Sequence, residues 1–93
     1  MRLEWSIHAF EDLVAFFDYI EVDNPLAAVT IDDRIRHHVQ QLTRHPQSGR
    51  IGRVENTREL VIDRTPYIVA YHVVPDAVRV LHSAQMWPDG LPE

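Results

Sequence analysis

Apolar residues recur with two different spacings along this 93-residue chain. Between residues 7 and 44 they return every three or four positions, which is the spacing of a helix that buries one side. Before and after that region they alternate with polar residues or form short runs, which is typical of strands. The pattern therefore predicts strands at the N-terminus and in the second half of the chain, with a helical region between them.

Two helices are expected in the helical region, and each has its own start signal. Ser6 is a suitable N-cap for the first, which should end near residue 22. Asn24-Pro25 supplies an N-cap and a first helical residue for the second. This second helix should run to about Arg44, because the residue before Pro46 avoids helical backbone angles. The predicted apolar stripes are Phe10, Leu13, Phe17 and Ile20, widened by Val14 and Phe16, and then Ala28, Ile31, Ile35, Val39 and Leu42.

The strands complete a single α+β domain over residues 1–93. They are expected near 2–5, 58–62, 67–74 and 78–83, and the loop at 47–57 has room for a short extra strand around Ile51. Turn residues separate the last three strands, which should form an antiparallel meander. The expected order is β-α-α-β-β-β: a helical hairpin at about 7–44 packs on one face of a small, mainly antiparallel sheet at about 50–84. The other face should stay open, and Trp87 should hold the short tail at 85–93 against the domain.

The acidic balance of the chain bears on its function. Fourteen acidic and nine basic residues give a formal net charge of −5, and all nine basic residues are arginines. Residues 1–48 have a balance of −4, from eight acidic residues and four arginines, and residues 49–93 have a balance of −1, from six and five. Proteins that bind nucleic acid directly are usually basic, so this composition weakens such a function.

Several classes of protein are disfavoured by what the sequence lacks. There is no cysteine, and therefore neither a disulfide framework nor a thiolate metal site. There is no His-Glu-x-x-His motif, and the neighbouring His37 and His38 point in different directions on a helix, so neither a metal nor another cofactor is expected. No secretory signal and no stretch of roughly 20 apolar residues is present, so we expect a cytoplasmic protein without membrane contact.

Short motifs along the chain occur in an order that resembles one known family. They are Leu3-Glu4-Trp5-Ser6, His45-Pro46-Gln47-Ser48-Gly49-Arg50, Thr57-Arg58-Glu59-Leu60, Pro66-Tyr67-Ile68-Val69-Ala70-Tyr71, and Leu81-His82-Ser83-Ala84-Gln85 followed by Trp87-Pro88. This ordered set is similar to the RelE/ParE toxins of type II toxin–antitoxin pairs and spans nearly the whole chain. The resemblance implies the α+β arrangement described above and a toxin that inhibits growth.

The resemblance also implies partners and targets. A cognate antitoxin is expected on the open face of the sheet, in a complex of two copies of each chain, with operator DNA reached only through the antitoxin. The first hypothesis is a toxin that cleaves ribosome-bound mRNA, as some members of the family do. The alternative is inhibition of DNA gyrase without catalysis, as in other members. A third alternative is a non-toxic member that only binds an antitoxin. The acidic, lysine-free composition weakens the first hypothesis and the paired long helices resemble the gyrase branch, but the residues leave the branch open.

Three residues are candidates for catalysis if the chain cleaves RNA: Arg58, Arg64 and His82. In the nucleases of the family the RNA 2′-hydroxyl attacks the adjacent phosphate, which requires a base, an acid and positive donors. His82 would be the base or the acid, and Arg64, in the turn before Pro66-Tyr67, would hold the phosphate. In the structural alternatives His82 is half-buried and bonded to the backbone, Arg64 is a solvated turn residue, and Arg58 is a surface ion-pair partner of Glu59.

Four further residues are candidates for substrate binding, namely Arg50, Arg53, Arg79 and Tyr71. Arg50 and Arg53 flank Gly52 in a loop, where they hold phosphate or are simply solvated. Arg79 is in the middle of a strand and points to the open face or lies along an edge. Tyr71 shares its face of a strand with Tyr67, so both stack on bases if that face is open or belong to the core if the helices cover it.

Overall fold

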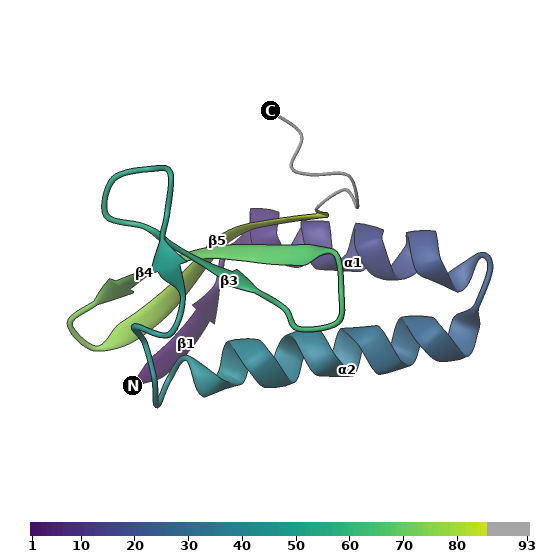
Figure 1. Ribbon diagram of the computed structural model, residues 1–93, viewed down its shortest axis with the longest axis horizontal. Helices are drawn as coiled ribbons and strands as arrows, with labels where there is room; N and C mark the ends of the chain where they lie inside the picture. Colours follow the sequence, from purple (N-terminus) through teal and green to yellow (C-terminus); the bar gives the residue numbers. More distant parts are fainter. Residues whose placement is uncertain (86–93) are drawn as a thin grey trace.

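The computed structural model describes residues 1–85, and these residues form a helical hairpin packed on one face of a five-stranded sheet (Figure 1). The elements are β1 (Arg2–Trp5), α1 (Ile7–Glu21), α2 (Pro25–Gln41), β2 (Arg50–Ile51), β3 (Arg58–Val61), β4 (Tyr67–Val74) and β5 (Ala77–Gln85). This confirms the expected α+β class and element order, including the short strand at Ile51. The expected role of Trp87 and most of the expected tail lie outside the described residues.

Both helices start where the sequence predicted. The Ser6 side chain accepts a hydrogen bond from the Ala9 N–H at 3.0 Å, and the Asn24 side chain accepts one from the Ala27 N–H at 3.0 Å. The second helix ends at Gln41 and not near residue 44, because residues 42–44 continue with tighter bonds to the carbonyl three residues earlier. Within residues 1–85, neither helix is long and apolar enough to cross a membrane.

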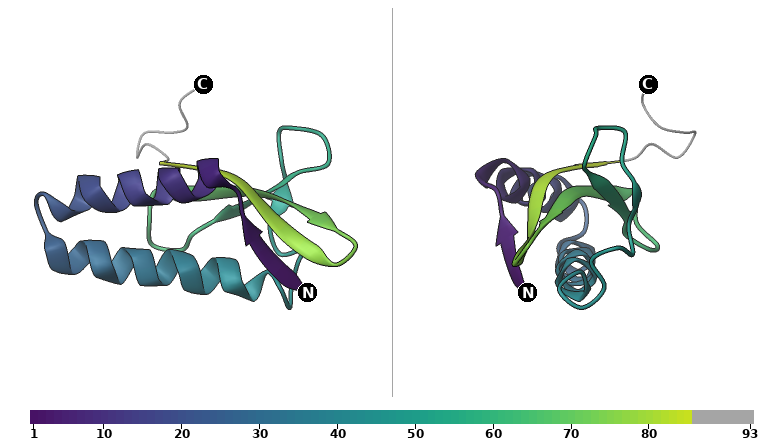
Figure 2. Two further views of the ribbon diagram at one scale, coloured as in Figure 1. Left: turned by 180° about the vertical axis from the view of Figure 1, so that it is seen from behind. Right: turned by 90° about the vertical axis from the view of Figure 1, so that its left-hand side faces the viewer.

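The strand order is β1-β5-β4-β3-β2, with β1 parallel to β5 and the other neighbours antiparallel. β5 contains a bulge, since Ala70 pairs with His82 and Tyr71 pairs with Val80, which leaves Leu81 as the extra residue. β1 ends at Trp5, and α1 then runs beside the second half of β5 (Figure 2).

Side chains at the start of α1 form hydrogen bonds with backbone groups of this part of β5. The Ser6 hydroxyl donates to the Leu81 carbonyl at 2.8 Å, and the Ser83 N–H donates to Asp12 Oδ2 at 3.2 Å. The Ser83 hydroxyl also bonds Tyr67 Oη at 2.5 Å in the interior. These polar contacts fix the position of α1 against the sheet.

The hydrophobic core lies between the hairpin and the sheet. It contains Ala9, Leu13, Phe16, Ile35, Val39, Leu42, Ile62, Tyr67, Val69, Tyr71, Val78 and Val80. The predicted stripe of α1 is wrong by part of a turn: Ala9 is buried, whereas Phe10 and Val14 are 44% and 41% exposed. The side of α1 that faces the core carries Ala9, Leu13, Phe16 and Ile20, whose spacing of four, three and four fits a helix equally well.

Candidate functional site

The face of the sheet opposite the helices carries three of the seven candidate residues, namely Arg50, Arg79 and His82. Side chains directly opposite one another on paired strands share a face, so the register defines two rows. The first row is Glu4, Arg79 and His72, and the second is His82, Ala70, Glu59 and Arg50. We refer to this surface, defined by the two rows, as the open face.

Arg79 lies on the open face, but a carboxylate balances its charge. Its Nε donates to Glu4 Oε1 at 2.8 Å, and Glu4 Oε2 accepts a second bond from Arg2 Nη2 at 2.7 Å. Arg2 also donates to Asp76 Oδ2 at 2.8 Å. The hydrogen bonds from Arg2 and then from Arg79 hold the pKa of the Glu4 carboxyl below its usual value. This end of the open face is therefore a network of alternating charges.

Arg50 and Arg53 share one carboxylate, that of Glu59. Arg50 Nη2 lies 3.1 Å from Glu59 Oε1, and Arg53 Nε lies 3.6 Å from Glu59 Oε2. The Glu59 side chain is only 12% exposed. Burial raises the pKa of Glu59, but the bonds from the Arg53 backbone N–H and the Arg50 guanidinium outweigh it, so the net pKa is lowered. The two arginines thus fasten the β2–β3 hairpin, and their positive charge is partly neutralised.

Arg58 points away from the open face. It pairs with Tyr71, which lies in the core on the side of the helices. Its Nη1 donates to the Gly49 carbonyl at 2.8 Å and approaches the Gln47 carbonyl at 3.4 Å. The structural alternative for Arg58, an ion pair with Glu59, is wrong, because Glu59 bonds Arg50 and Arg53 instead.

Arg64 and His82 lie apart from one another along the direction of the strands. Arg64 is in the β3–β4 turn with a left-handed φ of 63°, is exposed, and lies 3.8 Å from Asp63 Oδ2. His82 is exposed on the open face beside Ala70, which is three residues further along β4 than Tyr67. This offset alone amounts to about 10 Å along the strands.

A second histidine lies against His82. The rings of His8 and His82 have centroids 6.0 Å apart and an interplanar angle of 21°. His8 comes from the first turn of α1, and the contact arises because α1 passes beside the second half of β5. This pair could not be inferred from the sequence, since 74 residues separate its members and no local motif links them.

The structure corrects the assignment of Tyr71 as a substrate-binding residue. Tyr71 is 0% exposed and belongs to the core, which was the alternative interpretation. Its hydroxyl donates to the Pro46 carbonyl at 2.8 Å and accepts from the Gly49 N–H at 2.9 Å, and burial raises its pKa. A Cβ at Gly49 would lie 2.6 Å from this hydroxyl, so a glycine is required there. Tyr67 is likewise buried, and its ring packs against Phe16.

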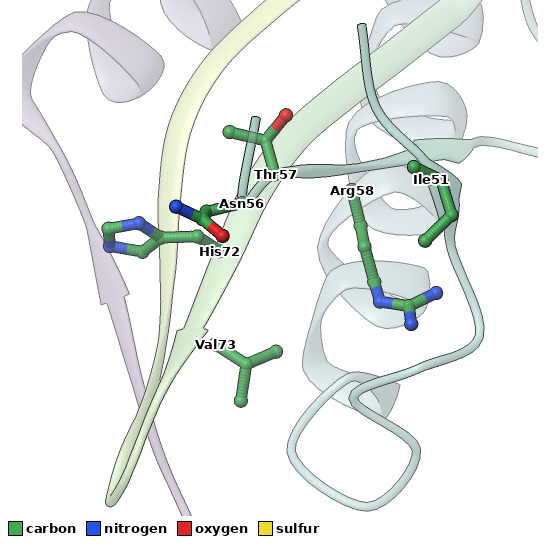
Figure 3. Close-up of a pocket in the computed structure, with 6 residues that line it drawn as sticks. All are labelled: Ile51, Asn56, Thr57, Arg58, His72 and Val73. Atoms are coloured by element: carbon green, nitrogen blue, oxygen red, sulfur yellow. The ribbon is translucent and has the colours of Figure 1, made fainter. Parts of the chain in front are cut away.

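A cavity of about 460 Å³ lies at the edge of β4, next to the β2–β3 hairpin (Figure 3). Its lining residues are Ile51, Asn56, Thr57, Arg58, His72 and Val73. His72 Nε2 is buried and has no hydrogen-bond partner within the described residues. This cavity could not be inferred from the sequence, because its walls come from three separate strands and a turn.

The arrangement of the charged residues indicates the class of protein. It is a small α+β domain whose polar residues form a mixed-charge β-surface and not a closed catalytic pocket. Within residues 1–85, no three His, Cys, Asp or Glu side chains are grouped closely enough to hold a metal ion.

Comparison with known proteins identifies the family. A family model described as "ParE toxin of type II toxin-antitoxin system, parDE" matches residues 3–87. "Putative toxin Y4kP" of Sinorhizobium fredii is 40% identical over 92 residues, which are 97% of this chain and 96% of that protein. "Toxin RelE2" of Caulobacter vibrioides is 34% identical over 88 residues, which are 91% of this chain and 98% of that protein.

A solved structure supports the same conclusion. The structure titled "Chromosomal ParDE TA system from P. aeruginosa" has a TM-score of 0.83 at 26% sequence identity, and the match covers 91% of this chain and 95% of that chain. The chain therefore belongs to the ParE toxin family and is a toxin of a type II toxin–antitoxin system. This confirms the resemblance to RelE/ParE toxins that the ordered motifs indicated.

Proposed function

We propose that this toxin inhibits DNA gyrase by binding to it, without chemistry of its own. The observation that carries the proposal is the separation of the three candidate catalytic residues. Arg58 is bonded to loop carbonyls on the side of the helices, His82 projects from the opposite face, and Arg64 lies in a distant turn. Phosphoryl transfer from an RNA 2′-hydroxyl requires an acid, a base and phosphate donors around one bond.

The charge distribution of the open face also favours a protein target over RNA. Arg2, Arg79, Arg50 and Arg53 are each within 4 Å of a carboxylate, and the whole chain has a net charge of −5. Binding to RNA draws on unpaired positive charge along the phosphate backbone. A surface of alternating sign instead matches a protein surface with a complementary alternation.

The test combines two measurements on the toxin expressed without an antitoxin. We expect purified toxin to inhibit supercoiling by gyrase, cells to accumulate DNA breaks, and the 5′ ends of cellular mRNA to stay unchanged. His82→Ala and Arg64→Ala should each retain this inhibition, because neither residue has a catalytic role. In-frame mRNA cuts that disappear in both variants would instead establish RNA cleavage, and normal growth with neither effect would establish a non-toxic member.

Ribosome-dependent mRNA cleavage is the second candidate, and one observation favours it. His8 and His82 are both exposed and stacked with ring centroids 6.0 Å apart. Two neighbouring imidazoles could supply both the acid and the base that cleavage at an RNA 2′-hydroxyl requires. In this alternative His8→Ala should abolish mRNA cuts as completely as His82→Ala, which separates it from the gyrase proposal.

The partner that holds the toxin inactive is proposed to be an antitoxin that contacts the open face. The solved structure with the same fold is of a toxin–antitoxin system, and the open face is rich in unburied polar groups. We propose two copies of each chain in the complex, with operator DNA bound through the antitoxin alone. Co-expression with the adjoining gene and measurement of the mass of the complex test this, and recovery of the toxin by itself would contradict it.

A further inference from the structure

β4 has a short free edge that β3 does not cover. The pairing of β3 with β4 begins at Arg58 and Tyr71, whereas β4 continues through His72 and Val73 to Val74. Asn56, two residues before Arg58, has a left-handed φ of 66°, and the chain turns away from β4 there. Within residues 1–85, the last three residues of β4 therefore have β5 on one side and no strand on the other.

The backbone of Val73 faces this free side. The Tyr67 carbonyl accepts a hydrogen bond from the Ile62 N–H at 3.0 Å, so the backbone groups of Tyr67 point toward β3. Backbone groups of alternate residues in a strand point the same way, and those of Val69, Tyr71 and Val73 therefore do so too. The N–H and the carbonyl of Val73 are consequently a donor and an acceptor without a neighbouring strand.

The 460 Å³ cavity lies at this same free edge, and its volume is in the range of ligand-binding pockets. Its polar groups lie on two sides of the edge: His72 and Asn56 on one side, and Arg58 on the other (Figure 3). Val73, which is 41% exposed, provides apolar surface between these two sides, and Ile51, which is 75% exposed, adds apolar surface next to Arg58. An added strand would send alternate side chains to these two sides.

We propose that an extended segment of the antitoxin pairs with β4 at Val73 and places an acidic side chain beside Arg58. This inference rests on the proposed antitoxin partner and adds to it a particular edge and a particular chemistry. The Arg58 guanidinium and the Asn56 amide supply hydrogen-bond donors, and a carboxylate is the acceptor that satisfies a guanidinium best.

A second copy of this chain fits the edge less well than an acidic segment does. Pairing two copies through the same edge would bring a second Arg58 to this edge and no carboxylate for it, because Glu59 already bonds Arg50 and Arg53. Like charges facing each other across an interface are unfavourable. An acidic segment would instead supply a carboxylate to Arg58, whose bonds within residues 1–85 go to the Gly49 and Gln47 carbonyls.

The experiment compares two proline variants that are matched in residue type, exposure and strand position. Val73→Pro removes the N–H that the proposed strand would use. Val61→Pro removes an N–H that also points away from the neighbouring strand, at a valine 42% exposed on another part of the sheet edge. Neither N–H has a ladder partner, so both prolines are compatible with the sheet.

Binding is measured by calorimetry with the full-length companion protein and with short overlapping synthetic peptides that tile it. We expect Val73→Pro to weaken binding about tenfold or more and Val61→Pro to leave it within about twofold, since one lost interfacial hydrogen bond has an effect of this size. A single peptide should bind, and replacing its acidic residue by the corresponding amide should also weaken binding about tenfold.

Hydrogen exchange on the wild-type complex provides a readout that needs no variant. The amide of Val73 should become protected on binding, and the amide of Val61 should not. An unprotected Val73, or equal losses from the two prolines, would overturn the proposed edge while the toxin–antitoxin complex itself stands. If wild-type toxin binds no companion at all, the proposed partner fails and the docking proposal fails with it.

Discussion

The hydroxyl of Tyr71 gives the sharpest test of how the loop before β2 is held. Tyr71→Phe removes one oxygen atom from a residue that is otherwise fully packed. That oxygen donates to the Pro46 carbonyl at 2.8 Å and accepts from the Gly49 N–H at 2.9 Å. Both partners belong to the segment that joins α2 to β2, and Gly49 is itself buried. The substitution therefore leaves a buried N–H and a partly exposed carbonyl without protein partners.

The expected loss follows from these two groups. A buried polar group without a partner costs about 1–3 kcal/mol, and a group that water can reach costs less. We expect Tyr71→Phe to lower the free energy of unfolding by about 2 kcal/mol. For a domain of this size, that corresponds to a fall in Tm of about 8–16 °C.

Thermal and urea unfolding of the purified toxin measure this effect, with Tyr67→Phe as the matched control. The Tyr67 hydroxyl bonds only the Ser83 hydroxyl, which also lies 3.4 Å from the Ala9 carbonyl and so keeps an acceptor. The control should therefore lose only about 1 kcal/mol. Equal stabilities for Tyr71→Phe and the wild type, within about 0.5 kcal/mol, would refute the idea that this hydroxyl holds the loop.

Three further predictions concern charge, pH and helix capping. The pKa of Glu59 is lower in the folded than in the unfolded state, so the stability that Glu59 contributes is present at neutral pH and is lost as the pH falls through the folded pKa. Glu59→Gln should therefore lower the free energy of unfolding by about 1 kcal/mol at pH 7 and have little effect in acid, which urea unfolding at the two pH values measures. Burial raises the pKa of Tyr67 to about 12 from 10.0. The contribution of Tyr67 to stability should therefore be fully present below pH 10 and be lost as the pH rises toward 12, and Tyr67→Phe should reduce this loss in alkaline melts. Ser6→Ala should lower Tm more than Asn24→Ala, because the Ser6 hydroxyl caps α1 and also bonds the Leu81 carbonyl, whereas the Asn24 side chain caps α2. Equal losses of Tm would contradict the added role of Ser6.

The fold was largely predictable because its signals are local. N-caps at Ser6 and Asn24, a proline at the first position of α2 and apolar runs separated by turn residues each act within a few residues of the chain. The error in the α1 stripe has the same origin. Phe10 and Ala9 are neighbours on the helix, and the periodicity alone does not say which of two overlapping stripes faces the sheet.

The candidate site was less predictable, because its chemistry depends on pairs of residues far apart in the sequence. The sequence around Arg79 predicts an unpaired cation, but Glu4, 75 residues earlier in the chain, lies beside it on β1 and accepts its hydrogen bond. Arg50, Arg53 and Arg58 lie close together in the sequence, yet the first two bond Glu59 and the third bonds loop carbonyls. The identity of each residue was known, but its partner was not.

The sequence by itself determined the secondary structure, the α+β class and the family, since spacing and turn chemistry act through short-range sterics and ordered motifs survive in the chain. Only the tertiary structure decided which face of the sheet each arginine occupies and which charges are paired. It also decided that Tyr71 is buried and that β4 extends beyond its pairing with β3 at Val73. The reason is that a side chain's direction in a strand alternates with every residue. Its surroundings are therefore fixed only by register, bulge and strand order, which long-range pairing sets.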